Sequence, residues 1–180
     1  MVAIRKVDSE EVTMKQQQIR YLLKWSTLLL ISSLVGCATT SSFVTLDAVG
    51  PGRTPCNIGA SPGYLRVYTA TEEHNDGDVM YYPHTEYTIC NPNGTRFRTV
   101  SNHIGMHDED PATVTLPSGH YVIIADSETD GRIKVPVTVG EGRTTVVELE
   151  GKRARNPSDV DPADAVKTPS GQIAGWRAAS

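Results

Sequence analysis

Apolar and polar residues alternate along seven short segments of the chain, and this two-residue period is typical of strands that bury one face. The clearest segment is 132–139, in which four β-branched residues at every second position face one way and Arg, Lys, Pro and Thr face the other. No segment after Cys37 has a convincing 3.6-residue period. The predicted fold class is therefore all-β, a single antiparallel β-sandwich of about seven strands. The expected strands are 64–70, 86–90, 96–100, 113–116, 120–125, 132–139 and 143–149.

Turn residues separate these strands and indicate two details of the sheet. Asn-Pro-Asn-Gly at 91–94 lies between the segments 86–90 and 96–100, which predicts a hairpin. Pro136 lies inside 132–139 and has no backbone N–H to donate. That strand is therefore expected at a sheet edge or at a bulge.

The composition of the flanking segments sets the expected domain boundaries. The sandwich is assigned to residues 63–151. Residues 37–62 contain repeated Gly and Pro breakers and are predicted to form a flexible tether, within which 43–46 offers at most a short strand. The polar, Pro- and Asp-rich segment 152–180 is predicted to be a mostly disordered tail. Its part 172–177 contains Ile and Trp, and either docks on the domain or stays unstructured.

An apolar run over 25–35 follows a basic lead-in and is too short to span a membrane. It ends in Leu34-Val35-Gly36-Cys37, which resembles a bacterial lipobox. The resemblance implies that residues 1–36 are a signal peptide and that Cys37 carries a lipid anchor. It also implies a cell-envelope location, at the outer membrane facing the periplasm or the surface in a Gram-negative source. The alternatives are a plain cleaved signal and a short signal anchor. Met14 opens a better basic lead-in than Met1 and is expected to be the true start.

Removal of the signal peptide changes the charge and the cysteine count. Five of the 17 Lys and Arg and three of the 21 Asp and Glu precede Cys37. The mature chain then has 12 basic and 18 acidic residues, a net charge of −6, with no basic stripe, so no nucleic-acid partner is expected. Cys56 and Cys90 remain as a candidate disulfide in an oxidising compartment, and the alternative is two unpaired thiols.

The stretch from Val114 to Ala125 carries a second resemblance. Its order is strand, Leu-Pro-Ser-Gly, His-Tyr, strand, which is similar to prealbumin-like sandwich modules, including carboxypeptidase regulatory-like and Cna-B-type domains. In this pattern Leu116 fills the core, and Tyr121 can bond to the backbone across the corner, as in a tyrosine corner. The resemblance implies a stalk, spacer or binding accessory. The nearest enzymes of this fold, transthyretin-like hydrolases, have a C-terminal Tyr-Arg-Gly-Ser that is absent here.

Two loops are expected to carry any binding function, because loops on a rigid sandwich are where such residues gather. These loops are 71–85 and 101–111. In the first, Tyr81, Tyr82 and His84 form a candidate binding loop whose tyrosines would stack on sugars or anchor a partner. The alternative is that one or both tyrosines plug the end of the sandwich.

The same loops hold four of the five histidines, which are weak candidates for a transition-metal site: His74, His84, His103 and His107. The alternative is that all four are solvated loop residues. No metal or other cofactor is expected, and the motifs of serine hydrolases, zinc proteases and phosphate loops are absent. The chain is therefore not expected to be an enzyme.

The sequence as a whole predicts a lipid-anchored cell-envelope protein with a non-catalytic structural or binding role. Its expected partners are the membrane, through the anchor, and an envelope protein or glycan. Two alternatives stay open: a carbohydrate-binding accessory that uses the loop tyrosines, and a metal-dependent hydrolase that uses the loop histidines.

Overall fold

The chain divides into two units, 1–41 and 42–180. The computed structural model describes residues 43–51, 61–151 and 162–178, all within the second unit. The predicted signal peptide and Cys37 lie outside the described residues. Among the residues described, no helix is both long and apolar enough to cross a bilayer.

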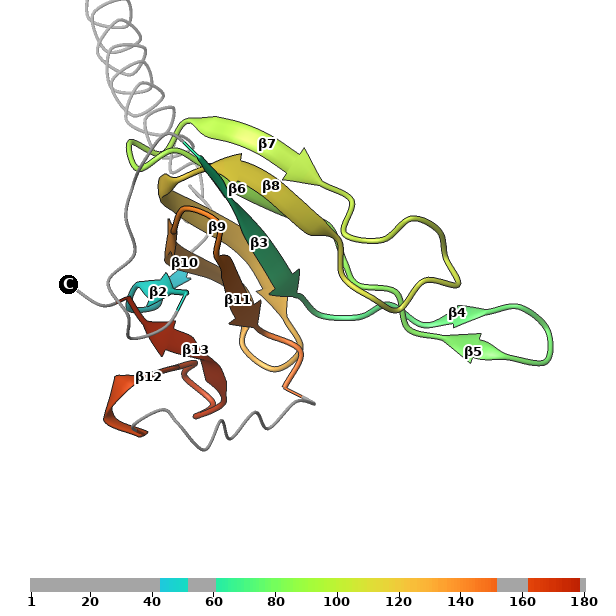
Figure 1. Cartoon of the computed structure of the whole chain (residues 1–180). Coiled ribbons are helices and arrows are strands. Elements are labelled where there is room, and N and C mark those ends of the chain that lie inside the picture. The colour runs from blue at the N-terminus through green and yellow to red at the C-terminus, as the bar shows by residue number, and fades with distance from the viewer. Residues whose placement is uncertain (1–42, 52–60, 152–161, 179–180) are drawn as a thin grey trace, which may run out of the picture. The chain divides into compact units, whose positions relative to one another are not determined.

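The second unit is an all-β sandwich, as predicted, and all seven expected strands are present (Figure 1). One layer contains four of them in the order β10-β9-β6-β7, and the other has β3 between β11 and β8. The strand bounds are β3 Pro62–Tyr68, β6 Tyr87–Cys90, β7 Arg96–Val100, β8 Thr113–Pro117, β9 Gly119–Ser127, β10 Gly131–Val139 and β11 Thr144–Glu148.

The core lies between the two layers and follows from the alternation. Along β10 all four β-branched residues at alternate positions are at most 2% exposed, and Leu65 and Val67 of β3 are fully buried. Each such side chain contributes about 1.5–3 kcal/mol on leaving water. A shift of register by one residue would expose the whole set, so burial fixes the register of these strands. The four residues are Ile133, Val135, Val137 and Val139.

The two predicted turns have the expected geometry. Between β6 and β7, the N–H of Gly94 donates to the Asn91 carbonyl at 2.9 Å, and Gly94 has a positive φ of 85°. Between β8 and β9, the Tyr121 hydroxyl donates to the Pro117 carbonyl at 2.9 Å, which is the expected bond across the corner. Burial raises the pKa of Tyr121. Membership of the prealbumin-like group stays a prediction.

The pairing directions differ from the purely antiparallel arrangement that alternation predicts. β11 pairs with β3 in parallel over its whole length, and two short N-terminal strands pair with β10 in parallel. Alternation specifies which face of a strand is buried. It carries no information on the direction of the neighbouring strand, so it could not have predicted these pairs.

Part of the predicted tether, residues 43–51, lies on the sandwich. β1 (Val44–Thr45) and β2 (Val49–Gly50) cover the side of β10 opposite β9. β10 is therefore not the edge strand that Pro136 suggested. On this side of β10, Ile133 and Lys134 pair with β1, and Val137 pairs with β2. Pro136 lies between these two pairings, so its missing N–H falls where no ladder bond is needed.

Part of the predicted disordered tail is also ordered. After a 3₁₀ turn (Pro162–Asp164), β12 (Ala165–Lys167) and β13 (Ile173–Arg177) form a two-stranded extension, and β13 pairs with β2. β13 coincides with the segment for which docking was one alternative. Val166 and Ala174 are buried in the main core. Too few apolar residues occur here to form a readable period, so the sequence pattern could not show that the segment docks.

Candidate binding face

The two candidate loops lie together at one end of the sandwich. Residues 69–86 leave β3 and form a hairpin of β4 (His74–Asn75) and β5 (Met80–Tyr81), which projects from that end beside the β7–β8 loop, 101–112 (Figure 1). We call residues 69–86 and 101–112 the loop-end face.

Polar and ring contacts join the two parts of the loop-end face. The backbone N–H of Tyr82 donates to Glu109 Oε1 at 2.8 Å. His107 Nε2 lies 3.1 Å from Asp76 Oδ2, and its ring is 4.5 Å from that of Tyr81 between centroids. The sequence placed these residues in two separate loops, and the fold brings them into one surface.

A buried polar network supports this surface from below. Thr69, His84 and Asn102 are 0%, 2% and 1% exposed. Thr69 Oγ1 donates to the Thr85 carbonyl at 2.8 Å and accepts from Asn102 Nδ2 at 3.0 Å. The Thr69 carbonyl is 2.9 Å from His84 Nδ1. Hydrogen bonds in a buried, low-dielectric site are strong, so this network holds the two loops against each other, although Asn102 Oδ1 and Thr85 Oγ1 have no hydrogen-bond partner among the described residues.

Asn102 holds the β7–β8 loop in place and was not identified from the sequence. Its Nδ2 also donates to the Val67 carbonyl at 3.0 Å. Its backbone carbonyl accepts from the Ala112 N–H at 3.2 Å, and this bond closes the loop. It is the one non-glycine among the described residues with a positive φ, 67°. Asn tolerates that conformation better than most residues. The residue type was therefore the only signal in the sequence.

The two ring nitrogens of His84 differ in their contacts. A carbonyl can only accept, so the contact with Thr69 assigns the ring proton to Nδ1, and in the neutral ring Nε2 is then an acceptor. The ring packs edge-on against Tyr68, with centroids 5.6 Å apart. Nε2 has no partner among the described residues, while the residue lines the hollow of the loop-end face. His84 is thus a buried, oriented group beside that hollow.

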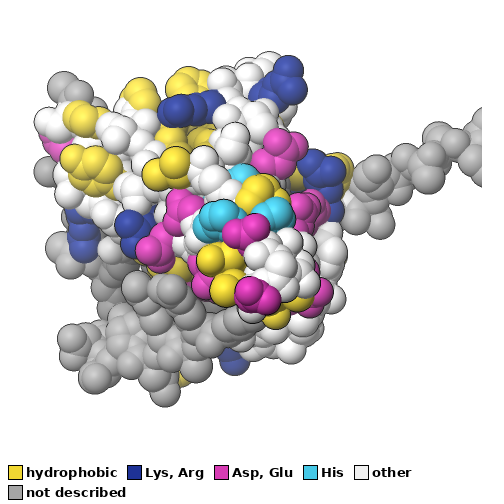
Figure 2. All heavy atoms as spheres, turned by 90° about the vertical axis from the view of Figure 1, so that its right-hand side faces the viewer, with side chains coloured by type: hydrophobic (Ala, Val, Ile, Leu, Met, Phe, Trp, Pro, Cys, Tyr) yellow, Lys and Arg dark blue, Asp and Glu magenta, His cyan; other side chains and the backbone are white. Residues whose placement is uncertain are grey.

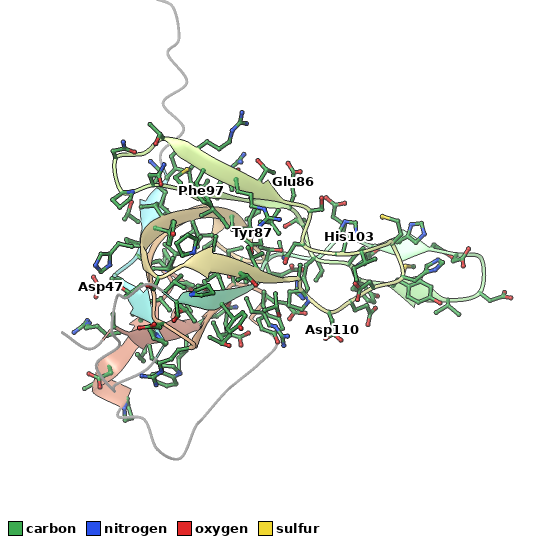
Figure 3. All side chains as sticks on the ribbon, turned by 45° about the horizontal axis from the view of Figure 1, so that its top comes forward. Asp47, Glu86, Tyr87, Phe97, His103 and Asp110 are labelled. Carbon is green, nitrogen blue, oxygen red and sulfur yellow. The ribbon has the colours of Figure 1, made fainter. Side chains whose placement is uncertain are left out.

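The hollow has a volume of about 620 Å³ and combines aromatic rings with carboxylates. The Asp108 carboxylate fixes the local loop by accepting from the N–H groups of Ile104 at 3.1 Å and Asp110 at 3.2 Å. Figure 3 shows His103 and Asp110 toward the end with the hairpin, and Asp47 away from it. The lining residues are Tyr81, Tyr82, His84, His107, Asp108, Glu109, Asp110 and Glu150.

The charge of the loop-end face is strongly one-sided. Its two segments contain eight carboxylates and no Lys or Arg. Figure 2, which looks onto this end, shows histidines near the centre with acidic and hydrophobic side chains around them, and basic side chains toward the rim. The negative potential of this surface favours cationic ligands. The carboxylates are Glu72, Glu73, Asp76, Asp78, Glu86, Asp108, Glu109 and Asp110.

Large hydrophobic side chains are also exposed on this face. Of the eight that are exposed among the described residues, five belong to it, and Ile104 is 97% exposed. Exposed apolar residues that gather on one surface mark an interaction site more often than singly scattered ones do. The five are Val79, Met80, Tyr82, Ile104 and Met106.

The predicted binding residues occupy different positions. Tyr82 is 38% exposed, and Tyr81 is half-buried against the His107 ring, so neither is a plug inside the core. His84 is almost completely buried and belongs to the supporting network. Whether the three bind a ligand stays a prediction.

The histidines do not form one cluster. The rings of His74 and His107 are 5.7 Å apart between centroids, while His84 is held by Thr69. His103 lines a second hollow of about 250 Å³. No group of three His, Cys, Asp or Glu side chains within the described residues could hold a metal ion.

Cys90 lies on β6 and is buried, with 4% of the residue exposed. Its candidate partner Cys56 lies outside the described residues, so the disulfide between them stays a prediction.

No protein-family model, curated protein or solved structure matches this chain.

Proposed function

We propose that this chain is a lipid-anchored cell-envelope protein that binds an envelope partner through its loop-end face, without catalysis. The observation that carries the binding role is the pair of exposed loops joined over the network of Thr69, His84 and Asn102. A rigid base reduces the entropy lost when the loops bind.

The composition of the face supports a protein partner. Tyrosine and methionine are enriched at the centres of protein interfaces, and exposed apolar side chains gain most from being covered. Tyr82, Met80, Met106 and Ile104 are exposed together on this face. In a chain that only spaced two other domains apart, these side chains would have no reason to gather there.

The anchor rests on the lipobox resemblance of Leu34-Val35-Gly36-Cys37. Metabolic labelling with an alkyne-tagged fatty acid should mark the wild-type protein, and the label should follow it into the membrane fraction. Cys37→Ser should lose both label and membrane fractionation, whereas the matched control Cys56→Ser should keep them. Labelling that survives in Cys37→Ser would refute the anchor.

The binding role is tested by cross-linking in intact cells. A benzophenone amino acid at position 104 should form a defined adduct, because Ile104 is 97% exposed on the proposed face. The control position is Tyr64, which is 38% exposed on β3 and outside the face. Equal adducts from both positions, or none from position 104, would contradict a specific binding role for this face.

A carbohydrate-binding role is a second candidate, because Tyr82 is exposed and could stack on a sugar ring. A glycan array probed with wild type and Tyr82→Ala separates the two roles. A carbohydrate ligand should lose binding in Tyr82→Ala while Ile104→Ser retains it. Absence of any glycan signal for the wild type supports the protein partner.

A further inference from the structure

The loop-end face combines two properties that together describe its partner. Its apolar side chains are exposed, and its two segments contain no Lys or Arg to pair with their carboxylates. Asp78 and Asp110 are exposed, and their carboxylates form no hydrogen bond or ion pair with any described residue. These charges are therefore available to a cation from outside.

His84 adds a separate observation that points to a ligand. It is 98% buried, its Nδ1 is fixed by the Thr69 carbonyl, and it lines the hollow. With Nδ1 donating, the neutral ring offers Nε2 as an acceptor that has no partner among the described residues. His84 lines both this hollow and the second, smaller one. An N–H donor that reaches Nε2 would satisfy it, and the carboxylates of the face favour a donor that is positively charged.

Taking the binding role as given, we infer that the partner is a protein segment carrying Lys or Arg beside exposed apolar side chains. The basic groups face the carboxylates and the hollow, and the apolar groups cover Ile104 and the methionines. Methionine side chains adapt to irregular partners, which suits a segment without one rigid shape.

Two other occupants fit the face less well. A membrane surface would accept Ile104, but the anionic lipids of bacterial membranes would be repelled by eight carboxylates. A neutral sugar would use Tyr82 but would leave the exposed carboxylates without counter-charges. Charge complementarity therefore favours the basic, apolar segment.

Fluorescence anisotropy with the detergent-solubilised full chain tests the inference. The probe is a fluorescein-labelled synthetic peptide of alternating Lys and Leu, and the control peptides replace Lys by Glu or Leu by Ser. The Lys-Leu peptide should bind, and its affinity should fall about tenfold when salt rises from about 0.05 M to 0.5 M, because surface charges are screened. The Glu-Leu peptide should not bind, and the Lys-Ser peptide should bind more weakly.

Matched variants separate the two properties. The double variant Asp78→Asn, Asp110→Asn should bind the Lys-Leu peptide with about fivefold lower affinity, and this affinity should depend less on salt. Ile104→Ser should lower the affinity about tenfold without changing its salt dependence. The controls are Glu141→Gln, in the β10–β11 turn at the other end of the sandwich, and Val44→Ser on β1, and neither should change the affinity.

Several results would overturn the inference. These are equal binding of the Lys-Leu and Glu-Leu peptides, unchanged affinity in the face variants, and binding to phosphatidylglycerol vesicles in place of the peptide. The sequence also has basic residues at 152, 153 and 155. If the peptide binds only after these are replaced by Ser, the occupant is the chain's own segment and an external partner is excluded.

The cross-linking experiment distinguishes this inference from the binding role itself. An adduct at position 104 without binding of the Lys-Leu peptide keeps the binding role and refutes the basic partner. Absence of both the adduct and the peptide binding refutes both.

Discussion

Two regions outside the seven central strands are both predicted to be loops or flexible chain. One of them leaves its apolar side chains exposed, and the other buries them against the sandwich. The first is the loop-end face. The second, which we call the closing segments, consists of residues 43–51 and 162–178. The closing segments bury Val49, Val166 and Ala174 to 2% exposure or less. The loop-end face instead leaves Ile104 97% exposed.

The two regions also differ in whether their charged side chains are paired. In the closing segments Arg177 donates to Asp47 at 2.8 Å, and Ser170 donates to both Asp130 carboxylate oxygens at 2.8 and 2.7 Å. On the loop-end face the carboxylates of Asp78 and Asp110 have no hydrogen-bond or ion-pair partner among the described residues. These charged groups of the closing segments thus pair within the sandwich and stabilise the sheet. The loop-end face keeps its groups available, as a binding surface requires.

The largest expected effect is at the base of the loop-end face. Asn102→Ala removes hydrogen bonds to the Val67 carbonyl and to Thr69, and it leaves Ala at a positive φ. The free energy of unfolding should fall by about 3 kcal/mol, measured by urea denaturation. Asn93→Ala, which loses only exposed turn contacts to Thr95, should cost less than about 1 kcal/mol. Equal losses would show that the buried network does not support the face.

The next effect compares two glycines, one from each region. A Cβ on Gly175 would lie 2.6 Å from Val49 Cγ1 and 3.1 Å from the Val146 carbonyl oxygen. Gly175→Ala should therefore destabilise the protein by about 2 kcal/mol and loosen β13. A Cβ on Gly105 would have no neighbouring atom within 4 Å, so Gly105→Ala should leave the stability unchanged. Thermal denaturation of both variants measures the contrast. Neutral behaviour of both would argue that β13 is not packed on β2.

A third prediction uses the pH dependence of the closing segments. Burial alone would raise the pKa of Asp130, but hydrogen bonds from Ser170, Thr168 and Thr129 outweigh it and hold the pKa below its usual value. A depressed carboxyl pKa stabilises the fold above the unfolded pKa of about 4, and the contribution is lost as pH falls through the lower folded pKa. The hydrogen-exchange protection factors of 165–177, which are corrected for the pH dependence of intrinsic exchange, should therefore fall below about pH 4.

The matched variant for this prediction is Asp130→Asn. It should show lower protection factors at neutral pH and little further loss of protection on acidification, because the titrating group is gone. An acid-induced loss of protection that is as large in Asp130→Asn as in wild type would assign the effect to another group.

The smallest expected effect on stability is at Ile104. Ile104→Ser should change the free energy of unfolding by less than about 0.5 kcal/mol, because the side chain has almost no contacts to lose. Val166→Ala, in the closing segments, should cost about 2 kcal/mol, since Val166 is buried in the core. Urea denaturation of both variants measures the contrast. A large loss in Ile104→Ser would mean that this side chain serves the fold and not a partner.

Much of the candidate face was predictable from the sequence, although its geometry was not. Breaker residues and loss of alternation located the two loops, and the tyrosines and histidines marked them as candidates. The convergence of His107 on Asp76 and Tyr81 depends on where β3, β7 and β8 end in space. The role of Asn102 depends on a backbone conformation that no local pattern records.

The sequence by itself determined the seven strands, the buried face of β10 and the Tyr121 corner, because these follow from a two-residue period and from turn chemistry over a few residues. Only the tertiary structure decided the parallel pairing of β3 with β11 and the addition of the closing segments to the sheet. It also decided the joining of two loops over Thr69, His84 and Asn102. Those contacts connect residues far apart in the chain, and their stability comes from burial and hydrogen bonds that exist only once the layers have packed.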